Sequence, residues 1–371
     1  MTDTLYLRPI AFADSPQGED GEAIRLAGGM VYASRFALIV RRDGQIVQRS
    51  RVAMPDMGDV LARLPDPLAA EGAGQWAALK ASHDPLQLGA RTIRLDQPQI
   101  MGILNVTPDS FSDGGKFLDN PDEAHAHAAA MVEAGAAIID VGGESTRPGA
   151  GAVWEGDELK RVIPAIERLA AMGAAISTDT RRPAVMEAAI AAGAHLVNDV
   201  SALRHDPRSL EFAVRTGVPV VLMHTPGEGD ALHDGGNYRD VVLDVFDWLK
   251  GRRDAALAAG IARGKIILDP GIGFGKSLAD NLALLNALPL FHALGQPLLV
   301  GASRKRMIGA LSNEAPAHQR QGGSILLAAK LFDAGVQLIR VHDVAGTVQG
   351  LHVWRGLRDA ALTDFSQLPA G

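Results

Sequence analysis

Eight short apolar runs, separated by stretches long enough to form helices, constrain the fold of this chain more than any other feature. Near-continuous Ile, Val and Leu are typical of parallel strands buried on both faces, and the Ala-rich stretches between the runs fit crossover helices. Eight such units over about 270 residues predict an α/β chain with a closed (β/α)8 TIM barrel, ahead of an open doubly wound sheet. The runs are residues 100–105, 137–141, 175–178, 196–200, 219–224, 266–269, 298–301 and 338–341.

Residues 1–95 do not show the alternation of apolar runs and Ala-rich stretches that begins at residue 100, and they predict a small α/β extension ahead of the barrel. Asp43 and Gly44 separate two apolar runs, at 36–40 and 46–52, and this arrangement is a strong hairpin signal. Residues 59–80 favour helix only in part, so we predict only short helices there. The interruptions are Pro65, Pro67, Gly72 and Gly74. We assign no chemistry to this extension and place the barrel in residues 96–371.

Composition excludes several classes of partner and chemistry. The 371 residues carry 36 Lys and Arg against 43 Asp and Glu, a net charge of −7 with no basic block, so nucleic acid is not an expected partner. The cysteine count of zero excludes disulfides, thiolate nucleophiles and Cys-bound zinc. No window reaches about 18 uncharged apolar residues, and the N-terminus lacks the pattern of a secretory signal. We therefore expect a cytoplasmic protein without a membrane partner.

A charged, amide or imidazole group stands at or just after the end of every apolar run. In a barrel the C-terminal ends of all strands meet at one face, where barrel active sites are built. Strand ends are also polar simply because they meet water, and this alternative explains any single position about equally well. It explains a full set of eight less well. The groups are Asn105, Glu144, Arg147, Asp179, Asn198, Asp199, His224, Asp269, Lys305, Arg340 and His342.

The chemistry of these groups predicts a ligand with two unlike ends. Asp179, Asn198 and Asp269 offer acceptor oxygens that suit a planar ring edge with several N–H donors. Cationic side chains suit anionic oxygens at the other end; they are Lys305, Arg340, Arg147 and His342. Two Gly-rich connections, residues 107–115 and 142–149, lack apolar periodicity and predict loops that close over the mouth.

Residues 271–277 resemble a phosphate-binding loop but do not satisfy its pattern. The first glycine of that motif would fall on Pro270, and Lys276 occupies the third glycine position of the dinucleotide fingerprint. We therefore predict no nucleotide site there.

Two long motifs, at residues 101–115 and 139–149, resemble the signatures of the dihydropteroate synthase family, the folate-pathway enzymes that join a pterin to para-aminobenzoate. Residues 101–115 are similar to the first signature and residues 139–149 to the second. Further agreement, in the family's order, covers residues 99 to about 357 and leaves the first 95 outside. The shorter matches are at 179–180, 197–199, 222–224, 268–271, 273–276, 303–305 and 339–343.

The resemblance implies a transferase that condenses 6-hydroxymethyl-7,8-dihydropterin pyrophosphate with para-aminobenzoate to give 7,8-dihydropteroate and pyrophosphate. It implies Mg²⁺ at Asn105, a homodimer and a sulfonamide target. The implied catalytic residues are Asp179, Lys305, Arg340, Asp113 and Arg147. The implied substrate-binding residues are Asn198, Asp269, Met223, Phe274, Thr146, Pro148, Phe111 and His342.

Charge separation makes these implied roles physically sensible. Cleavage between the pterin methylene and pyrophosphate leaves positive charge on the pterin and negative charge on the departing group. Fixed acids near the ring and fixed cations with Mg²⁺ near the leaving group stabilise that separation. The arylamine is unprotonated at neutral pH, so its attack needs little help from a general base.

Two alternatives stay open, a pterin-dependent corrinoid methyltransferase and a non-catalytic pterin-binding paralogue. The methyltransferase would not need the motif at residues 146–148 or cations for a pyrophosphate, and the paralogue is disfavoured because no key position is lost. The chain also departs from the family pattern. Arg306 stands where the family often has Ser, and this puts a hydroxyl contact to the substrate carboxylate in doubt; Arg181 and Arg182 stand where a Lys is common.

Overall fold

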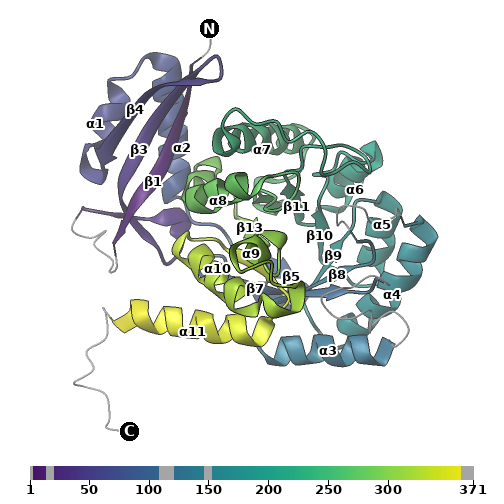
Figure 1. Cartoon of the computed structure of the whole chain (residues 1–371). Helices are drawn as coiled ribbons and strands as arrows, with labels where there is room; N and C mark the ends of the chain where they lie inside the picture. Colours follow the sequence, from purple (N-terminus) through teal and green to yellow (C-terminus); the bar gives the residue numbers. More distant parts are fainter. Residues whose placement is uncertain (1–2, 14–20, 108–120, 146–152, 361–371) are drawn as a thin grey trace, which may run out of the picture.

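The computed structural model describes residues 3–13, 21–107, 121–145 and 153–360 (Figure 1). Each of the eight predicted apolar runs forms a parallel strand, which confirms the barrel. The strands pair in the order β12-β11-β10-β9-β8-β7-β14-β13, and a parallel bridge between Leu268 and Leu298 joins the two ends. They are β7 (Gln99–Asn105), β8 (Ile138–Gly142), β9 (Ile176–Asp179), β10 (Leu196–Asp199), β11 (Val220–Met223), β12 (Ile266–Asp269), β13 (Leu299–Val300) and β14 (Leu338–Val341).

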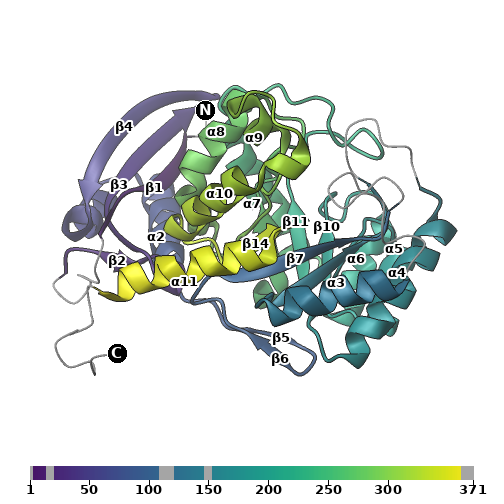
Figure 2. The same cartoon turned by 60° about the horizontal axis from the view of Figure 1, so that its bottom comes forward.

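Helices surround the barrel on its outer side (Figure 2). Their starts follow local capping chemistry: Ser277 and Asp280 form a reciprocal capping box at α8, and Asp240 accepts from two backbone amides at α7. The helices are α3 (Pro121–Glu133), α4 (Glu155–Ala171), α5 (Pro183–Ala191), α6 (Pro207–Thr216), α7 (Val241–Ala258), α8 (Leu278–Ala287), α9 (Arg306–Leu311), α10 (Gln321–Asp333) and α11 (Val344–Ala360). Short 3₁₀ helices occupy Arg263–Lys265, Leu288–Leu294 and Ala317–Gln319.

The extension is an antiparallel sheet with two helices packed on it. The predicted hairpin is confirmed: Asp43 and Gly44 both have positive φ, 48° and 82°, as a two-residue turn between twisted strands requires. β1 and β4 each pair with β3, and the short β2 also pairs with β3. The elements are β1 (Asp3–Ala13), β2 (Ile24–Arg25), β3 (Tyr32–Arg42), β4 (Gln45–Ala53), α1 (Met57–Ala62) and α2 (Asp66–Lys80), with 3₁₀ turns at Leu26–Gly28 and Met54–Asp56.

The expectation of only short helices in residues 59–80 is wrong, because α2 runs for 15 residues. Pro65 and Pro67 lie at its start, where proline is tolerated, and therefore do not interrupt it. Gly72 serves close packing: a Cβ there would lie 2.6 Å from Leu61 Cδ2 and 2.7 Å from Leu5 Cδ2. Packing of α2 on β1 thus outweighs the low helix propensity of glycine.

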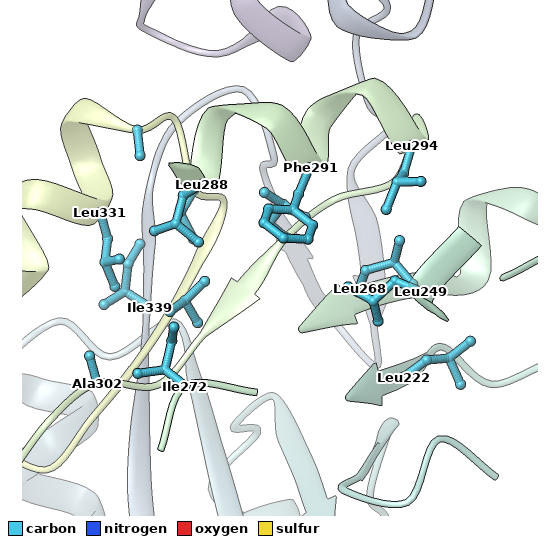
Figure 3. Close-up of a cluster of buried hydrophobic side chains, with 14 of the residues drawn as sticks. Leu222, Leu249, Leu268, Ile272, Leu288, Phe291, Leu294, Ala302, Leu331 and Ile339 are labelled. Carbon is cyan, nitrogen blue, oxygen red and sulfur yellow. The ribbon is translucent and has the colours of Figure 1, made fainter. Parts of the chain in front are cut away.

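The extension packs against the barrel through α7 and the 3₁₀ helix 288–294. The ring of Tyr6 lies edge-on to Phe246 at 5.4 Å, and its hydroxyl donates to Asp247 at 2.7 Å. Arg41 forms an ion pair with Asp244 at 2.5 Å. One continuous set of buried apolar residues runs from the extension sheet into the barrel wall. Figure 3 shows part of it between strands and helices, with Leu222, Leu268 and Ile339 of the barrel against Phe291 and its neighbours.

A second hairpin closes the N-terminal end of the barrel. β5 (Leu86–Leu88) and β6 (Arg91–Ile93) pair antiparallel and lie below the strands in Figure 2. Their apolar side chains pack with the first inward-facing residues of the barrel strands, which leaves the opposite, C-terminal end open for a site. The residues on the hairpin side of this contact are Leu86, Leu88, Ile93 and Leu95. The residues on the barrel side are Met101, Ile138, Ala175, Leu196, Val221, Ile267, Leu299 and Leu338. Among the described residues, no helix is long and apolar enough to cross a membrane.

Candidate active site

A cavity of about 1140 Å³ opens at the C-terminal ends of the barrel strands. Its wall combines residues from strand ends with residues of the connections that follow them, as expected for a barrel site. The polar and aromatic side chains in the wall are Asn105, Thr107, Glu144, Ser145, Asp179, His233, Phe274, Lys276, Ser277, Asn281, Ser303, Arg304, Lys305, Arg306, Arg320, Arg340 and His342.

A network of four polar side chains forms the floor beneath this cavity. Arg340 of β14 donates through Nε to Asp140 at 2.6 Å and through Nη2 to Asp179 at 2.7 Å. Asn198 of β10 donates to the same oxygen of Asp140 at 3.1 Å. The side chain of Asp140 is fully buried, and its other oxygen has no hydrogen-bond partner. One guanidinium is therefore shared between two carboxylates from neighbouring strands.

Sequence reasoning did not identify Asp140 as a site residue. It lies inside the apolar run of β8 rather than at its end, whereas the predicted site residues were chosen from the polar groups at strand ends. A charged residue inside a run that is otherwise fully buried was the signal available, because such a charge requires a partner.

Burial sets the protonation of the two predicted acids. It raises the pKa of Asp179 to about 7, with Arg340 opposing the rise and Asp140 adding to it. Burial also raises the pKa of Asp269 to about 6, opposed by a hydrogen bond that its Oδ1 accepts from the Gly271 amide at 2.7 Å. Both carboxyl groups are thus poised to change charge near neutral pH, as is common at active sites.

Lys305 and Phe274 form the opposite wall. The Lys305 ammonium lies 4.7 Å from the centre of the Phe274 ring and donates to the Ile272 carbonyl. Burial lowers the pKa of Lys305 to about 8, with Asp269 opposing the fall. Gly273 lets the lysine pass, because a Cβ at its φ of +86° would lie 2.8 Å from Lys305 Cδ.

Two side chains that sequence reasoning did not single out support the Phe274 wall. The imidazole of His233 stacks on Phe274, with ring centres 5.0 Å apart and planes within 6°. Lys276 donates to the Gly271 and Phe274 carbonyls at 2.8 and 3.0 Å, and so braces the turn that carries the ring. Residues 271–277 therefore form a braced turn beside the cavity, although they match no nucleotide motif.

The structure brings nine of the predicted site residues together and leaves five undescribed. In the cavity wall are Asn105, Asp179, Phe274, Lys305, Arg340 and His342. Buried just behind the wall are Asn198, Asp269 and Met223. Phe111, Asp113, Thr146, Arg147 and Pro148 lie outside the described residues. The side chain of Arg306 stands at the rim, 78% exposed and 3.7 Å from Glu314.

The comparison with known proteins identifies the family. A family model described as "Pterin binding enzyme" matches residues 101–342. The dihydropteroate synthase of Escherichia coli is 47% identical over 263 residues, which are 71% of this chain and 92% of the relative. The chain belongs to the dihydropteroate synthase family. It is therefore an enzyme, a transferase of the dihydropteroate synthase type.

Solved dihydropteroate synthases share the barrel. The Xanthomonas albilineans dihydropteroate synthase, solved with 4-aminobenzoic acid, is 47% identical and superposes with a TM-score of 0.69, covering 78% of this chain and all of that one. The Yersinia pestis dihydropteroate synthase, solved in a sulfonamide drug complex, is 46% identical with a TM-score of 0.71 and covers 74% of this chain and 99% of its own. The extension lies outside the family match.

Proposed function

We propose that this dihydropteroate synthase joins 6-hydroxymethyl-7,8-dihydropterin pyrophosphate to para-aminobenzoate in the cavity at the barrel mouth. The observation that carries the proposal is the gathering of Asp179, Lys305 and Arg340 in the wall of one cavity, with Asp269 buried just behind that wall. Acids and cations at this density are costly to bury unless a ligand uses them.

The pterin occupies the inner end of the cavity in this proposal. Asp269 and Asn198 accept and donate at the ring edge, and Asp179 stabilises positive charge that develops on the ring. Lys305 donates to a ring acceptor, and Met223 packs on the ring face. Para-aminobenzoate lies farther out, against Phe274 and Lys305, and Arg306 at the rim supplies a cation for its carboxylate.

The pyrophosphate leaves on the side of Arg340 and His342. A guanidinium has five N–H donors, so Arg340 bonded to Asp140 and Asp179 keeps donors for a phosphate oxygen. The bond from the pterin methylene carbon to the pyrophosphate oxygen breaks, and the arylamine nitrogen bonds to that carbon and loses a proton. We also assign roles in substrate binding and catalysis to the five undescribed residues, Phe111, Asp113, Thr146, Arg147 and Pro148.

Mg²⁺ fits this end of the site through Asn105. Among the described residues, no group of three or more His, Cys, Asp or Glu could hold a metal. Mg²⁺ is commonly held by one or two protein oxygens together with substrate phosphates and water, and the Asn105 amide oxygen in the cavity wall suits that role. Bound there, Mg²⁺ neutralises charge on the leaving group.

The proposal extends to assembly and compartment. Leu326 of α10 and Leu357 of α11 are 72% and 73% exposed, and these two helices pack side by side, so we place a homodimer interface on them. We place the enzyme in the cytoplasm, where a chain with no cysteine suits the reducing conditions.

Pyrophosphate release tests the function. The purified chain with pterin pyrophosphate, para-aminobenzoate and Mg²⁺ is expected to release pyrophosphate and to be inhibited by sulfonamides in competition with the aminobenzoate. Asp179→Asn is expected to fold but to lose turnover by about 100-fold or more, because its role is electrostatic. Asp254→Asn, on the outer surface of α7, is the matched control.

Two results would support the rival functions instead. Pterin binding without pyrophosphate release favours a non-catalytic paralogue. Methyl transfer from a methylated pterin to a corrinoid protein favours a methyltransferase.

A further inference from the structure

A buried cluster of two arginines and one glutamate lies next to the cavity, and its glutamate, Glu144, is part of the cavity wall. The carboxylate of Glu144 accepts four hydrogen bonds from the arginines, two of 3.1 Å from Arg181 and two of 2.9 Å from Arg182, and a longer one of 3.5 Å from the Val153 amide. The three side chains are only 6%, 5% and 11% exposed. Glu144 follows β8 and lines the cavity, and the arginines follow β9, two and three residues after Asp179.

Arg182 bonds to both ends of the connection between β8 and α4. Besides Glu144, it donates to the Val153 carbonyl at 2.7 Å and to Glu158, fully buried in α4, at 2.6 Å. Glu144 and Val153 lie on either side of residues 146–152, which are outside the described part. One guanidinium therefore fixes both described ends of the β8–α4 connection against β9.

Arg181 extends the cluster to a third connection. It donates to the Gly229 carbonyl and to Asp230 at 2.7 Å, both in the segment between β11 and α7. The connections that follow β8, β9 and β11 are thus linked to one another at the mouth of the barrel, through the Glu144 carboxylate and the Arg181 guanidinium.

Electrostatics keeps this cluster charged at neutral pH. Burial by itself raises the pKa of Glu144, but hydrogen bonds from Arg182 and Arg181 outweigh it and hold the pKa below its ordinary value. Buried ion pairs contribute little net stability because desolvation opposes the attraction, yet their geometry is strict. A planar fork on a carboxylate fixes distance and angle together, and a lysine cannot reproduce this.

We propose that Arg182, acting through Glu144, is a positioning residue of the synthase reaction. It holds the wall at Gly143, Glu144 and Ser145 in register with β9, from which Asp179 faces the substrate. The inference rests on the proposed function, since it concerns the same site. It assigns Arg182 no contact with either substrate.

A matched pair of conservative variants tests the inference in the full-length chain. Arg182→Lys removes the fork and keeps the charge. Arg41→Lys makes the same substitution at an arginine that is equally buried, at 11% exposure, and also paired with two carboxylates, but that lies in the extension. We expect Arg182→Lys to lower kcat by about 10- to 100-fold while the Kd for pterin pyrophosphate, measured by fluorescence without aminobenzoate, stays within about threefold. Arg41→Lys is expected to change neither quantity.

Hydrogen–deuterium exchange separates this inference from the proposed function. Arg182→Lys is expected to raise exchange in residues 141–145 and 153–157, and Arg41→Lys is not. If the unaltered chain releases no pyrophosphate, the proposed function fails, and the exchange result still decides whether Arg182 fixes this wall. Unchanged exchange in Arg182→Lys, unchanged kcat, or a loss of pterin affinity equal to the loss of kcat would each overturn the positioning role.

Discussion

A single guanidinium shared by two carboxylates sets the charge of the site at the residue scale. Arg340 carries one positive charge and pairs with both Asp140 and Asp179. When both acids are ionised, the three side chains together therefore retain one negative charge. Burial makes that charge costly, and the pKa of Asp179 rises to about 7. The acid assigned to the electron-poor ring is therefore also an acid that protonation neutralises near neutral pH.

Replacing Asp140 by Asn is expected to shift the pH profile of the enzyme. Removal of this neighbouring charge lowers the pKa of Asp179, because a like charge that raised it is gone and Arg340 stays. If ionised Asp179 is the active form, the acidic limb of kcat/KM moves to lower pH. The measurement is kcat/KM from pH 5 to about 9 for both proteins. An unmoved limb, with the variant folded, would show that Asp179 is not the group that titrates.

Replacing His233 by Ala is expected to weaken aminobenzoate binding more than catalysis. A stacked ring pair contributes about 0.5–1.5 kcal/mol, so without its support Phe274 should bind the second substrate about 2- to 10-fold less well. The change should appear in the KM for aminobenzoate and not in that for pterin pyrophosphate. His352→Ala, an exposed position on α11, is the control. Equal changes in both KM values would contradict the assigned place of the ring.

What the sequence reveals about the site follows from where each residue stands. Asp179, Asp269 and Lys305 were predictable because strand ends in a barrel must converge. The charge of Asp140 inside an apolar run indicated that it needs a partner but not which one, because Arg340 and Asn198 are 200 and 58 residues away in the chain. Spatial pairing over such separations leaves no local pattern.

At the scale of elements, apolar continuity predicted strands better than glycine content predicted helices. The eight barrel strands were predictable because a parallel strand buried on both faces needs an unbroken apolar run. The β5–β6 hairpin was missed, since three-residue strands are too short to show alternation. The length of α2 was underestimated because Pro65 and Pro67 stand at its start and do not interrupt it, and because the close packing of Gly72 offsets its low helix propensity.

The two glycines of α2 predict opposite effects of the same substitution. A Cβ at Gly74 meets no atom within 4 Å, so Gly74→Ala should stabilise the chain by about 0.5–1 kcal/mol through helix propensity. At Gly72 the added methyl must displace Leu61 and Leu5, an overpacking that costs about 1–3 kcal/mol. This cost exceeds the gain in helix propensity, so Gly72→Ala should destabilise the chain. Urea unfolding of both variants measures the difference. Two stabilising substitutions would mean that α2 does not pack closely on β1.

For the whole molecule, the question is where the barrel unit begins. The sequence pattern placed the boundary at residue 95, between the extension and the first barrel strand. In the structure, residues 86–95 pack against the N-terminal end of the barrel, whereas residues 3–13 and 21–80 form a sheet with two helices on the outside. No extension residue is among those that line the described cavity. We therefore propose that the independent barrel starts ahead of the hairpin, near residue 84.

Two truncations test this boundary. A chain of residues 84–371 keeps the hairpin, and we expect it to fold and to retain turnover. Its stability should be lower, because removal of the extension exposes Phe246 and Phe291 to solvent. A chain of residues 96–371 also loses Leu86, Leu88, Ile93 and Leu95, each of them buried. At about 1.5–3 kcal/mol per side chain this loss reaches about 6–12 kcal/mol, comparable with the whole stability of a typical domain.

The shorter chain should therefore fail to fold, and circular dichroism with thermal melting measures the difference between the two. Equal melting temperatures for both truncations would show that the hairpin is dispensable and that the boundary lies at residue 95. Failure of both would show instead that the extension and barrel are one folding unit, since the continuous apolar core between them would then be required for either to fold.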